Sequence, residues 1–239
     1  MIVISQLLKI LKSMIFPEWC LLCGKEGQLI CQKCTNNLSK PDFTTCIACD
    51  NLTINGETHK YCSSSNQISN FYYLYEYSEP LKRILKHAKD INCAFKYFKY
   101  LIKHNNNNSY ENLNQSIDLI TYIPRSTIKN RLIDHAQYIA LQIISIQKLS
   151  TTKLQPLLKI SKHTKKPQKE LNREERFLAS KGKYNIDIKN YTLIKDKTIL
   201  IIDDIATTGA SIGAAADCLL NAGAAKVIAI TLAKEIRYN

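Results

Sequence analysis

Seven of the nine cysteines fall between residues 20 and 62, and their spacing limits what this segment can fold into. Two Cys-x2-Cys pairs come first; a third pair is followed, nine residues later, by a His-x2-Cys pair. A two-residue spacer lets both side chains of a pair turn toward one ion, and two pairs complete the tetrahedral set that Zn²⁺ prefers. The sequence therefore predicts two closed, structural zinc sites, formed by Cys20, Cys23, Cys31 and Cys34 and by Cys46, Cys49, His59 and Cys62.

A disulfide framework is the alternative interpretation of these cysteines. It would require an oxidising compartment, and seven cysteines would leave one without a partner. Metal binding would also supply folding energy that the few apolar residues of this segment cannot. Cys93 and Cys218 stand apart from the cluster, and we expect both to be small buried apolar residues.

The first sixteen residues are apolar but do not resemble a secretory signal. Lys9 and Lys12 interrupt the run, no small-residue cleavage site follows, and the stretch is too short to span a bilayer. We expect a short amphipathic helix packed on the protein, with interfacial membrane contact as the alternative. The expected location is cytoplasmic, without stable membrane insertion.

The chain is strongly basic, with a formal net charge of +13. A charge of this size favours an anionic partner: nucleic acid, a phosphorylated small molecule or an acidic membrane surface. Between residues 81 and 104 only Asp90 opposes seven basic side chains, namely Lys82, Arg83, Lys86, Lys89, Lys96, Lys99 and Lys103. The alternative is an ordinary solvated helix face.

Beyond the cysteine region, apolar runs alternate with helical patterns. The expected order is a strand at 71–77, a helix to about 103, a strand at 118–123, a helix at 133–148, a strand at 198–202, a helix at 210–222 and a strand at 226–232. This alternation predicts an α/β fold with a parallel sheet covered on both faces. The polar stretch 161–176 is long for a loop, which indicates either function or disorder.

The sequence TILIIDDIATTGAS, residues 198–211, carries an apolar strand directly into two aspartates. Buried unpaired charge is unfavourable, so Asp203 and Asp204 are expected at the exposed carboxyl end of the strand, where α/β sheets bind ligands. The following hydroxyls, a glycine and a helix N-terminus suit a phosphate, while the carboxylates suit a diol. Together these features describe ribose 5-phosphate.

Three alternatives compete with this interpretation. An Asp-Asp strand end also binds Mg²⁺ in P-loop NTPases, but the chain lacks G-x-x-x-x-G-K-[ST]. A phospho-acceptor aspartate leaves the Thr-Thr-Gly unexplained. Helix capping explains one aspartate but not the whole string.

ILIIDDIATTGAS resembles the phosphoribosyl-pyrophosphate motif of type I phosphoribosyltransferases, and a cysteine-pair region ahead of such a domain resembles the ComF family of competence proteins. The resemblance implies a parallel-sheet phosphoribosyltransferase-like domain preceded by a small double zinc ribbon. The expected divisions are a short amphipathic helix at 1–16, the ribbon at 17–66 and the phosphoribosyltransferase-like domain at 67–239.

The same resemblance implies roles for individual residues. Asp203 and Asp204 would hold the ribose hydroxyls, and the loop Ala206, Thr207, Thr208, Gly209, Ala210 and Ser211 would hold the 5-phosphate. A pyrophosphate loop would comprise Pro124, Arg125 and Ser126, and Lys89 matches a lysine of the family's first helix region. A closing loop would contain Thr164, Gln168 and Arg176, with Lys165 or Lys166 joining Arg125 and Mg²⁺ in neutralising the leaving pyrophosphate. Residues 131–137 depart from the family's pattern, so no acceptor is assigned.

The expected function is therefore Mg²⁺-dependent binding of phosphoribosyl pyrophosphate by a ComF-type protein of DNA uptake and natural transformation, with phosphoribosyl transfer to an unassigned acceptor. The alternative is a non-catalytic zinc-containing adaptor that binds single-stranded DNA or other competence proteins. A second copy of the chain, in a homodimer, is a further candidate partner.

Overall fold

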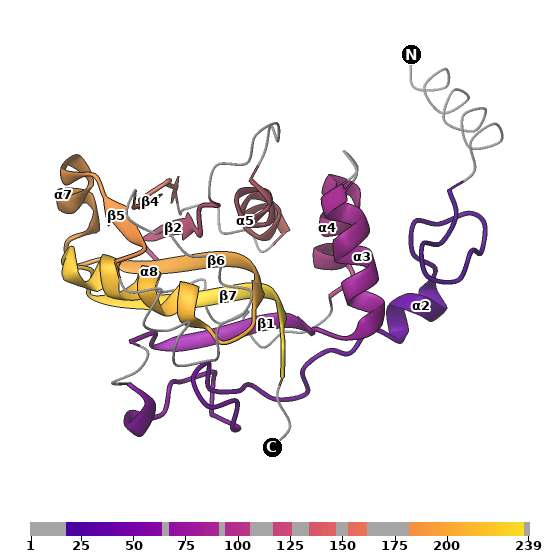
Figure 1. Cartoon of the computed structure of the whole chain (residues 1–239), viewed down its shortest axis with the longest axis horizontal. Helices are drawn as coiled ribbons and strands as arrows, with labels where there is room; N and C mark the ends of the chain where they lie inside the picture. Colours follow the sequence, from indigo (N-terminus) through magenta and orange to yellow (C-terminus); the bar gives the residue numbers. More distant parts are fainter. Residues whose placement is uncertain are drawn as a thin grey trace, which may run out of the picture.

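The structure is a computed structural model, and it describes residues 18–63, 67–90, 94–105, 117–125, 134–146, 153–161 and 182–236. Its largest element is a five-stranded sheet with strand order β1-β7-β6-β2-β3 (Figure 1). All neighbouring strands are parallel. The strands are β1 (Asn70–Glu76), β2 (Leu119–Tyr122), β3 (Lys153–Leu154), β6 (Thr198–Ala206) and β7 (Lys226–Lys234). The predicted parallel α/β architecture is confirmed.

Helices cover both faces of this sheet. On one face, α3 (Glu79–Asp90), α4 (Ala94–Lys103) and α5 (His135–Ile146) share a core with Leu200 and Ile202 of β6. On the other face, α8 (Ala210–Asn221) packs against Ile199 and Ile201. Because side chains alternate along a strand and both faces are buried, the central strands are almost continuously apolar.

A second, two-stranded antiparallel sheet was not predicted. It pairs β4 (Leu158–Ile160) with β5 (Tyr184–Ile186), and it is followed by η4 (Ile188–Asn190) and α7 (Tyr191–Ile194). β4 ends just before the polar stretch of the sequence, and β5 begins at Tyr184. The pair therefore brings residues 158–160 and 184–186, on either side of that stretch, together.

The cysteine region contains α2 (Gln32–Asn36) and η1 (Lys60–Cys62) and divides into two parts. The first part lies beside the helix pair of α3 and α4 (Figure 1), where the Tyr100 hydroxyl of α4 donates to the Ile30 carbonyl at 2.7 Å. The second part joins the edge of the sheet, because the amide of Phe71 in β1 donates to the Gly56 carbonyl at 2.8 Å.

Several element boundaries differ from the prediction, and β7, for example, ends at Lys234 instead of 232. β6 continues to Ala206 instead of ending at 202, because Asp203 and Ile205 pair with Thr231 and Ala233 of β7. The basic segment forms two helices, α3 and α4, in place of one. The predicted helix at 1–16 lies outside the described residues, and within the described part of the chain every helix is too short or too polar to span a bilayer.

Candidate functional site

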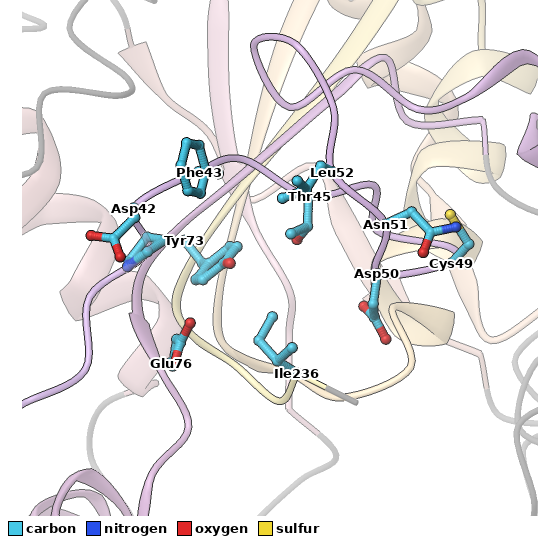
Figure 2. A pocket seen from close by; sticks show the side chains of 11 residues that line it. Asp42, Phe43, Thr45, Cys49, Asp50, Asn51, Leu52, Tyr73, Glu76 and Ile236 are labelled. Atoms are coloured by element: carbon cyan, nitrogen blue, oxygen red, sulfur yellow. The ribbon is translucent and has the colours of Figure 1, made fainter. Parts of the chain in front are cut away.

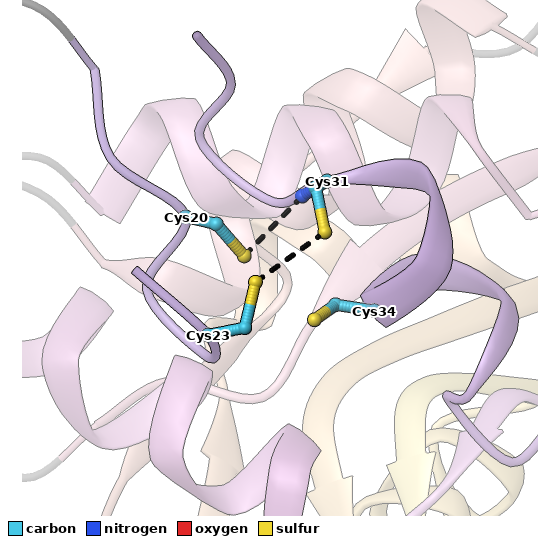
Figure 3. Close-up of side chains that lie close together, drawn as sticks. All are labelled: Cys20, Cys23, Cys31 and Cys34. Atoms are coloured by element: carbon cyan, nitrogen blue, oxygen red, sulfur yellow. Dashed lines mark hydrogen bonds between the residues drawn. The ribbon is translucent and has the colours of Figure 1, made fainter. Parts of the chain in front are cut away.

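The four cysteines of the first predicted zinc site converge on one point (Figure 3). Their sulfur atoms all lie within 4.8 Å of one another, and the Cys23 and Cys31 sulfurs are 3.6 Å apart. The backbone amide of Cys31 donates to the Cys20 sulfur at 3.3 Å. Four converging sulfurs with an amide donor fit the tetrahedral coordination of Zn²⁺.

The thiol pKa values differ widely within this cluster. Burial raises the pKa of Cys20, but amide donors from Cys31, Cys23 and Leu22 outweigh it and bring this pKa down to about 6. Burial and the neighbouring sulfurs raise the pKa of Cys34 to about 12. Some of the four thiols therefore ionise readily, but the ionisation of all four is unfavourable. A bound dication would compensate the negative charge of four thiolates.

The second predicted site forms in the same way from three cysteines and a histidine. The ligand atoms of Cys46, Cys49, His59 and Cys62 also lie within 4.8 Å of one another. His59 Nδ1 is 3.3 Å from the Cys49 sulfur, and His59 Nε2 is 3.1 Å from the Leu52 carbonyl oxygen. Because a carbonyl only accepts, Nε2 carries the proton and Nδ1 presents its lone pair to the cluster.

The two aspartates lie near the carboxyl end of β6, as predicted, but inside the strand instead of after it, and Asp204 is buried instead of exposed. Each is held by the backbone. Asp203 Oδ1 accepts from the amide of Asp204, and Asp204 Oδ1 accepts from the amide of Ile205, both at 2.8 Å. Burial, followed by the charge of Asp204, raises the pKa of Asp203 well above its ordinary range. Adjacent carboxylates of this kind fit a hard cation such as Mg²⁺ or a hydroxyl-bearing ligand.

Arg125 reaches the same place from the end of β2. Its guanidinium donates to Asp204 Oδ2 and forms an ion pair with that carboxylate. Its backbone amide donates at 3.1 Å to Asp134, whose other oxygen accepts from the amide of Ala136 at 3.0 Å. Asp134 therefore links the end of β2 to the first turn of α5.

The loop after β6 turns sharply into α8. Gly209 adopts the left-handed conformation, with φ of 73°, immediately before the helix. Lys183, just ahead of β5, donates to the Ser211 hydroxyl at 2.9 Å. Burial lowers the pKa of Lys183, and the charge of Asp203 opposes this shift. A lysine and a helix N-terminus thus meet on the predicted phosphate loop.

The second cysteine-histidine cluster packs directly on this loop. A Cβ atom placed on Gly209 would lie 2.7 Å from Cγ1 of Ile47, which sits between two of the cluster's cysteines. Asp50 pairs at 2.7 Å with Lys234, a fully buried residue at the end of β7. The ammonium of Lys234 also donates to the Thr207 carbonyl at 3.0 Å.

Several residues with a predicted role lie outside the described part of the chain. These are Ser126 and the closing-loop residues Thr164, Lys165, Lys166, Gln168 and Arg176, together with Cys93 and the side chain of Lys89. Cys218 differs from the prediction of a buried apolar residue, because it is only half-buried and its thiol donates to the Tyr184 carbonyl at 3.3 Å.

Three residues near the site were missed in the sequence, namely Asp134, Lys183 and Lys234. Of the three, only Lys234 could have been identified from the sequence, because a basic residue at the end of an apolar strand must find an anionic or carbonyl partner.

Comparison with known families agrees with this geometry. Residues 127–238, slightly less than half of the chain, match the family model of the phosphoribosyl transferase domain. The matched range contains both aspartates and the loop after them. A search of curated proteins gives no match. The fold is thus a phosphoribosyl transferase-type α/β domain preceded by a region with two metal-ligand tetrads compatible with a zinc ribbon.

Proposed function

We propose that the protein binds phosphoribosyl pyrophosphate with Mg²⁺ and transfers its phosphoribosyl group to an acceptor. The strongest support is the end of β6, where two carboxylates are followed by a hydroxyl-rich turn and the first turn of a helix. Carboxylates accept hydrogen bonds from vicinal hydroxyls, and helix N-termini favour phosphates. The domain match over residues 127–238 supports the same ligand.

In the proposed complex, Asp203 and Asp204 hold the ribose hydroxyls, and the loop 206–211 holds the 5-phosphate with help from Lys183. The hydroxyls take the place of Arg125 on Asp204, which frees the guanidinium to bind two oxygens of the pyrophosphate. Arg125, with Lys165 or Lys166, then stabilises the leaving group as its bond to C1 breaks. Mg²⁺, held largely by oxygens of the ligand, would supply further neutralisation there.

Binding is tested by calorimetry with phosphoribosyl pyrophosphate and Mg²⁺. Asp203→Asn combined with Asp204→Asn should abolish the binding heat, while zinc content and melting temperature show that the variant is folded. Equal affinity in the double variant and the natural chain would contradict the proposal. Turnover is tested separately, by pyrophosphate release with candidate nitrogenous bases as acceptors.

We also propose that this domain extends over residues 67–239, beyond the matched range. β1 precedes that range but pairs with β7 over six positions, and β2 pairs with β6 over four. Strands that share one sheet and one core are expected to fold as one unit.

A second candidate function is binding of single-stranded DNA, within DNA uptake as the ComF resemblance suggests. Its support is the exposed basic surface of two adjacent helices, formed by Lys82, Arg83 and Lys86 of α3 and Lys96, Lys99 and Lys103 of α4. Most of this charge is available, although Lys82 lies 3.6 Å from Glu79 and Lys96 lies 3.1 Å from Glu18. Phosphate neutralisation by such a surface does not depend on base sequence.

The variant Lys82→Gln, Arg83→Gln, Lys86→Gln should weaken binding of an oligothymidine probe. It should also reduce the slope of log affinity against log salt by roughly 0.7 for each lost phosphate contact. The control is Lys189→Gln with Lys195→Gln, which removes two exposed charges near α7. Affinity that is unchanged in the first variant would exclude α3 as the interface.

A further inference from the structure

Lys183, the residue just ahead of β5, is held in a fixed position beside α8. Its backbone carbonyl accepts from the Ser161 amide at 2.8 Å, which ties it to the end of β4. The next residue, Tyr184, is buried in the core that includes α8, and its ring centroid lies 5.2 Å from the Lys183 ammonium. Both the backbone and the side chain of Lys183 are therefore restrained, unlike those of a mobile surface lysine.

The charge of Lys183 has no carboxylate partner. The side chain is half-buried, and no carboxylate oxygen of the described residues lies within 4.0 Å of its Nζ. Burial lowers the pKa of Lys183, and the charge of Asp203 acts in the opposite direction. A half-buried cation without a counter-ion is stabilised by a bound anion.

Lys234 reaches the same loop with its charge already paired. Its ammonium is fully buried, lies 2.7 Å from a carboxylate oxygen of Asp50 and donates to the Thr207 carbonyl at 3.0 Å. Asp50 comes from the cysteine region and, with Ile236 just beyond β7, lines a cavity at this edge of the sheet (Figure 2). Of the two lysines that reach the loop in the described structure, Lys183 is therefore the one whose charge remains for a ligand.

The hydrogen bond from Lys183 fixes what the Ser211 hydroxyl can do. An ammonium only donates, so the Ser211 oxygen is the acceptor at 2.9 Å, and the single hydroxyl hydrogen remains for another acceptor. The buried Tyr184 hydroxyl does not take this hydrogen, because it has no hydrogen-bond partner among the described residues. Without the ammonium, a serine in the first turn of a helix can turn its hydrogen toward a backbone carbonyl instead.

We propose that Lys183 is a positioning residue that makes the Ser211 hydroxyl a donor to the 5-phosphate and thereby selects ligands that carry this group. The ammonium, the hydroxyl and the phosphate form one chain of hydrogen bonds, in which each bond polarises the next. Ser211 is half-buried, so its oxygen is accessible to a ligand. The inference rests on the proposed function, and it gives the unpredicted pair of β4 and β5 a part in the site.

The first test compares ligands in Lys183→Met, which removes the charge and keeps much of the apolar length. Calorimetry measures the binding of ribose 5-phosphate, phosphoribosyl pyrophosphate and pyrophosphate, each with Mg²⁺. Affinity for the first two ligands should fall at least about tenfold, because a charge-assisted contact is lost. Affinity for pyrophosphate should change by less than about twofold, because that group is assigned to Arg125. An equal loss for all three ligands would overturn the proposal.

The second test asks whether Lys183 acts through Ser211. Lys183→Met, Ser211→Ala and the double variant form a cycle, and two residues that act as one unit give losses that do not add in free energy. The double variant should therefore bind ribose 5-phosphate within about twofold of Lys183→Met. Losses that multiply would show that the two side chains act independently, which contradicts a positioning role.

Lys189→Met is the matched control, because it removes an exposed lysine charge a few residues beyond β5. It should leave the affinity for all three ligands unchanged, and melting temperatures show that each variant is folded. Equal binding of ribose 5-phosphate by Lys183→Met and the natural chain would overturn this inference alone. If the natural chain binds neither ribose 5-phosphate nor phosphoribosyl pyrophosphate, the proposed function is wrong and the inference with it.

Discussion

Asp203 and Asp204 are neighbours in sequence but have different surroundings. Asp204 is neutralised by Arg125, whereas the pKa of Asp203 is raised by burial and by the charge of Asp204. An acid whose pKa is raised on folding destabilises the folded protein once it ionises. Ionisation of Asp203 in the unliganded protein is therefore unfavourable, at the position where the proposed ligand would place its hydroxyl groups.

Asp203→Asn should consequently raise the melting temperature of the unliganded protein while abolishing binding of phosphoribosyl pyrophosphate. The direction of this change follows from proton linkage. The free energy of unfolding of the natural chain falls as the pH rises from about 4, the ordinary aspartate pKa, through the raised pKa of Asp203 in the folded state. The gain in the variant should thus be small near pH 4, grow as the pH rises, and be largest above the raised pKa of Asp203. Thermal melting from pH 4 to 8 measures it.

Asp187→Asn is the matched control for this experiment. A hydrogen bond from Lys159, at 2.6 Å, lowers the pKa of Asp187, so loss of that charge should not stabilise the protein. If Asp203→Asn lowers the melting temperature at pH 8, then Lys183 and Arg125 already compensate the Asp203 charge.

At the scale of elements, the turn between β6 and α8 is restricted by two independent effects. Gly209 and Gly182 have nearly equal backbone φ angles, +73° and +71°, which other residues rarely adopt. They differ in surroundings, because a Cβ on Gly209 would collide with Ile47, while a Cβ on Gly182 would meet no atom of the described residues within 4 Å. The two glycines therefore separate backbone strain from packing.

Gly182→Ala should lower the free energy of unfolding by about 1 kcal/mol, from backbone strain alone. Gly209→Ala should lower it by about 2–4 kcal/mol, because overpacking against Ile47 adds to the same strain. Chemical denaturation measures both values. Equal losses would show that the cysteine region does not press on the loop.

The order of the main strands and helices was predictable because their apolar patterns are strong. The short strands β4 and β5 were missed, since three residues with one buried position each, Leu158 and Tyr184, carry no readable period. The extension of β6 was missed for a different reason. Asp203 and Asp204 indicate a loop by composition, but pairing with β7 overrides that preference.

The candidate site was predictable to the extent that it is contiguous in sequence. The tetrads and the loop after β6 follow from local spacing. Lys183 and Lys234 could not be assigned, because their partners Ser211 and Thr207 are 28 and 27 residues away. Such contacts depend on the topology of the sheet, which local patterns do not encode.

At the scale of the whole molecule, the two metal-ligand clusters are connected to different parts of the fold. The first cluster is tied to α4 through the Tyr100 hydroxyl, which lies 2.8 Å from the Thr35 hydroxyl and donates to Ile30. The second is tied to the proposed phosphate loop through Ile47 on Gly209 and through Asp50 on Lys234. Metal bound at the second cluster should thus stabilise the loop in its present shape, whereas metal at the first should not.

Cys49→Ser and Cys23→Ser make a matched pair, because each changes the second cysteine of the first pair in its cluster. Elemental analysis should find about two Zn²⁺ in the natural chain and about one in each variant. Cys49→Ser should weaken binding of phosphoribosyl pyrophosphate about tenfold, a coupling of about 1.4 kcal/mol, while Cys23→Ser should change it by less than about twofold.

Coupling between two binding sites is reciprocal, which makes the connection testable from the other side. If zinc at the second cluster raises affinity for phosphoribosyl pyrophosphate about tenfold, the ligand must raise zinc affinity there by the same factor. Competition with a chelator should therefore extract one zinc about ten times less readily when phosphoribosyl pyrophosphate and Mg²⁺ are present, and the other zinc equally in both conditions. Because Ile47 and Asp50 both lie next to ligand cysteines, the protected zinc should be the one lost in Cys49→Ser. Protection of the zinc that remains in this variant would contradict the proposed connection.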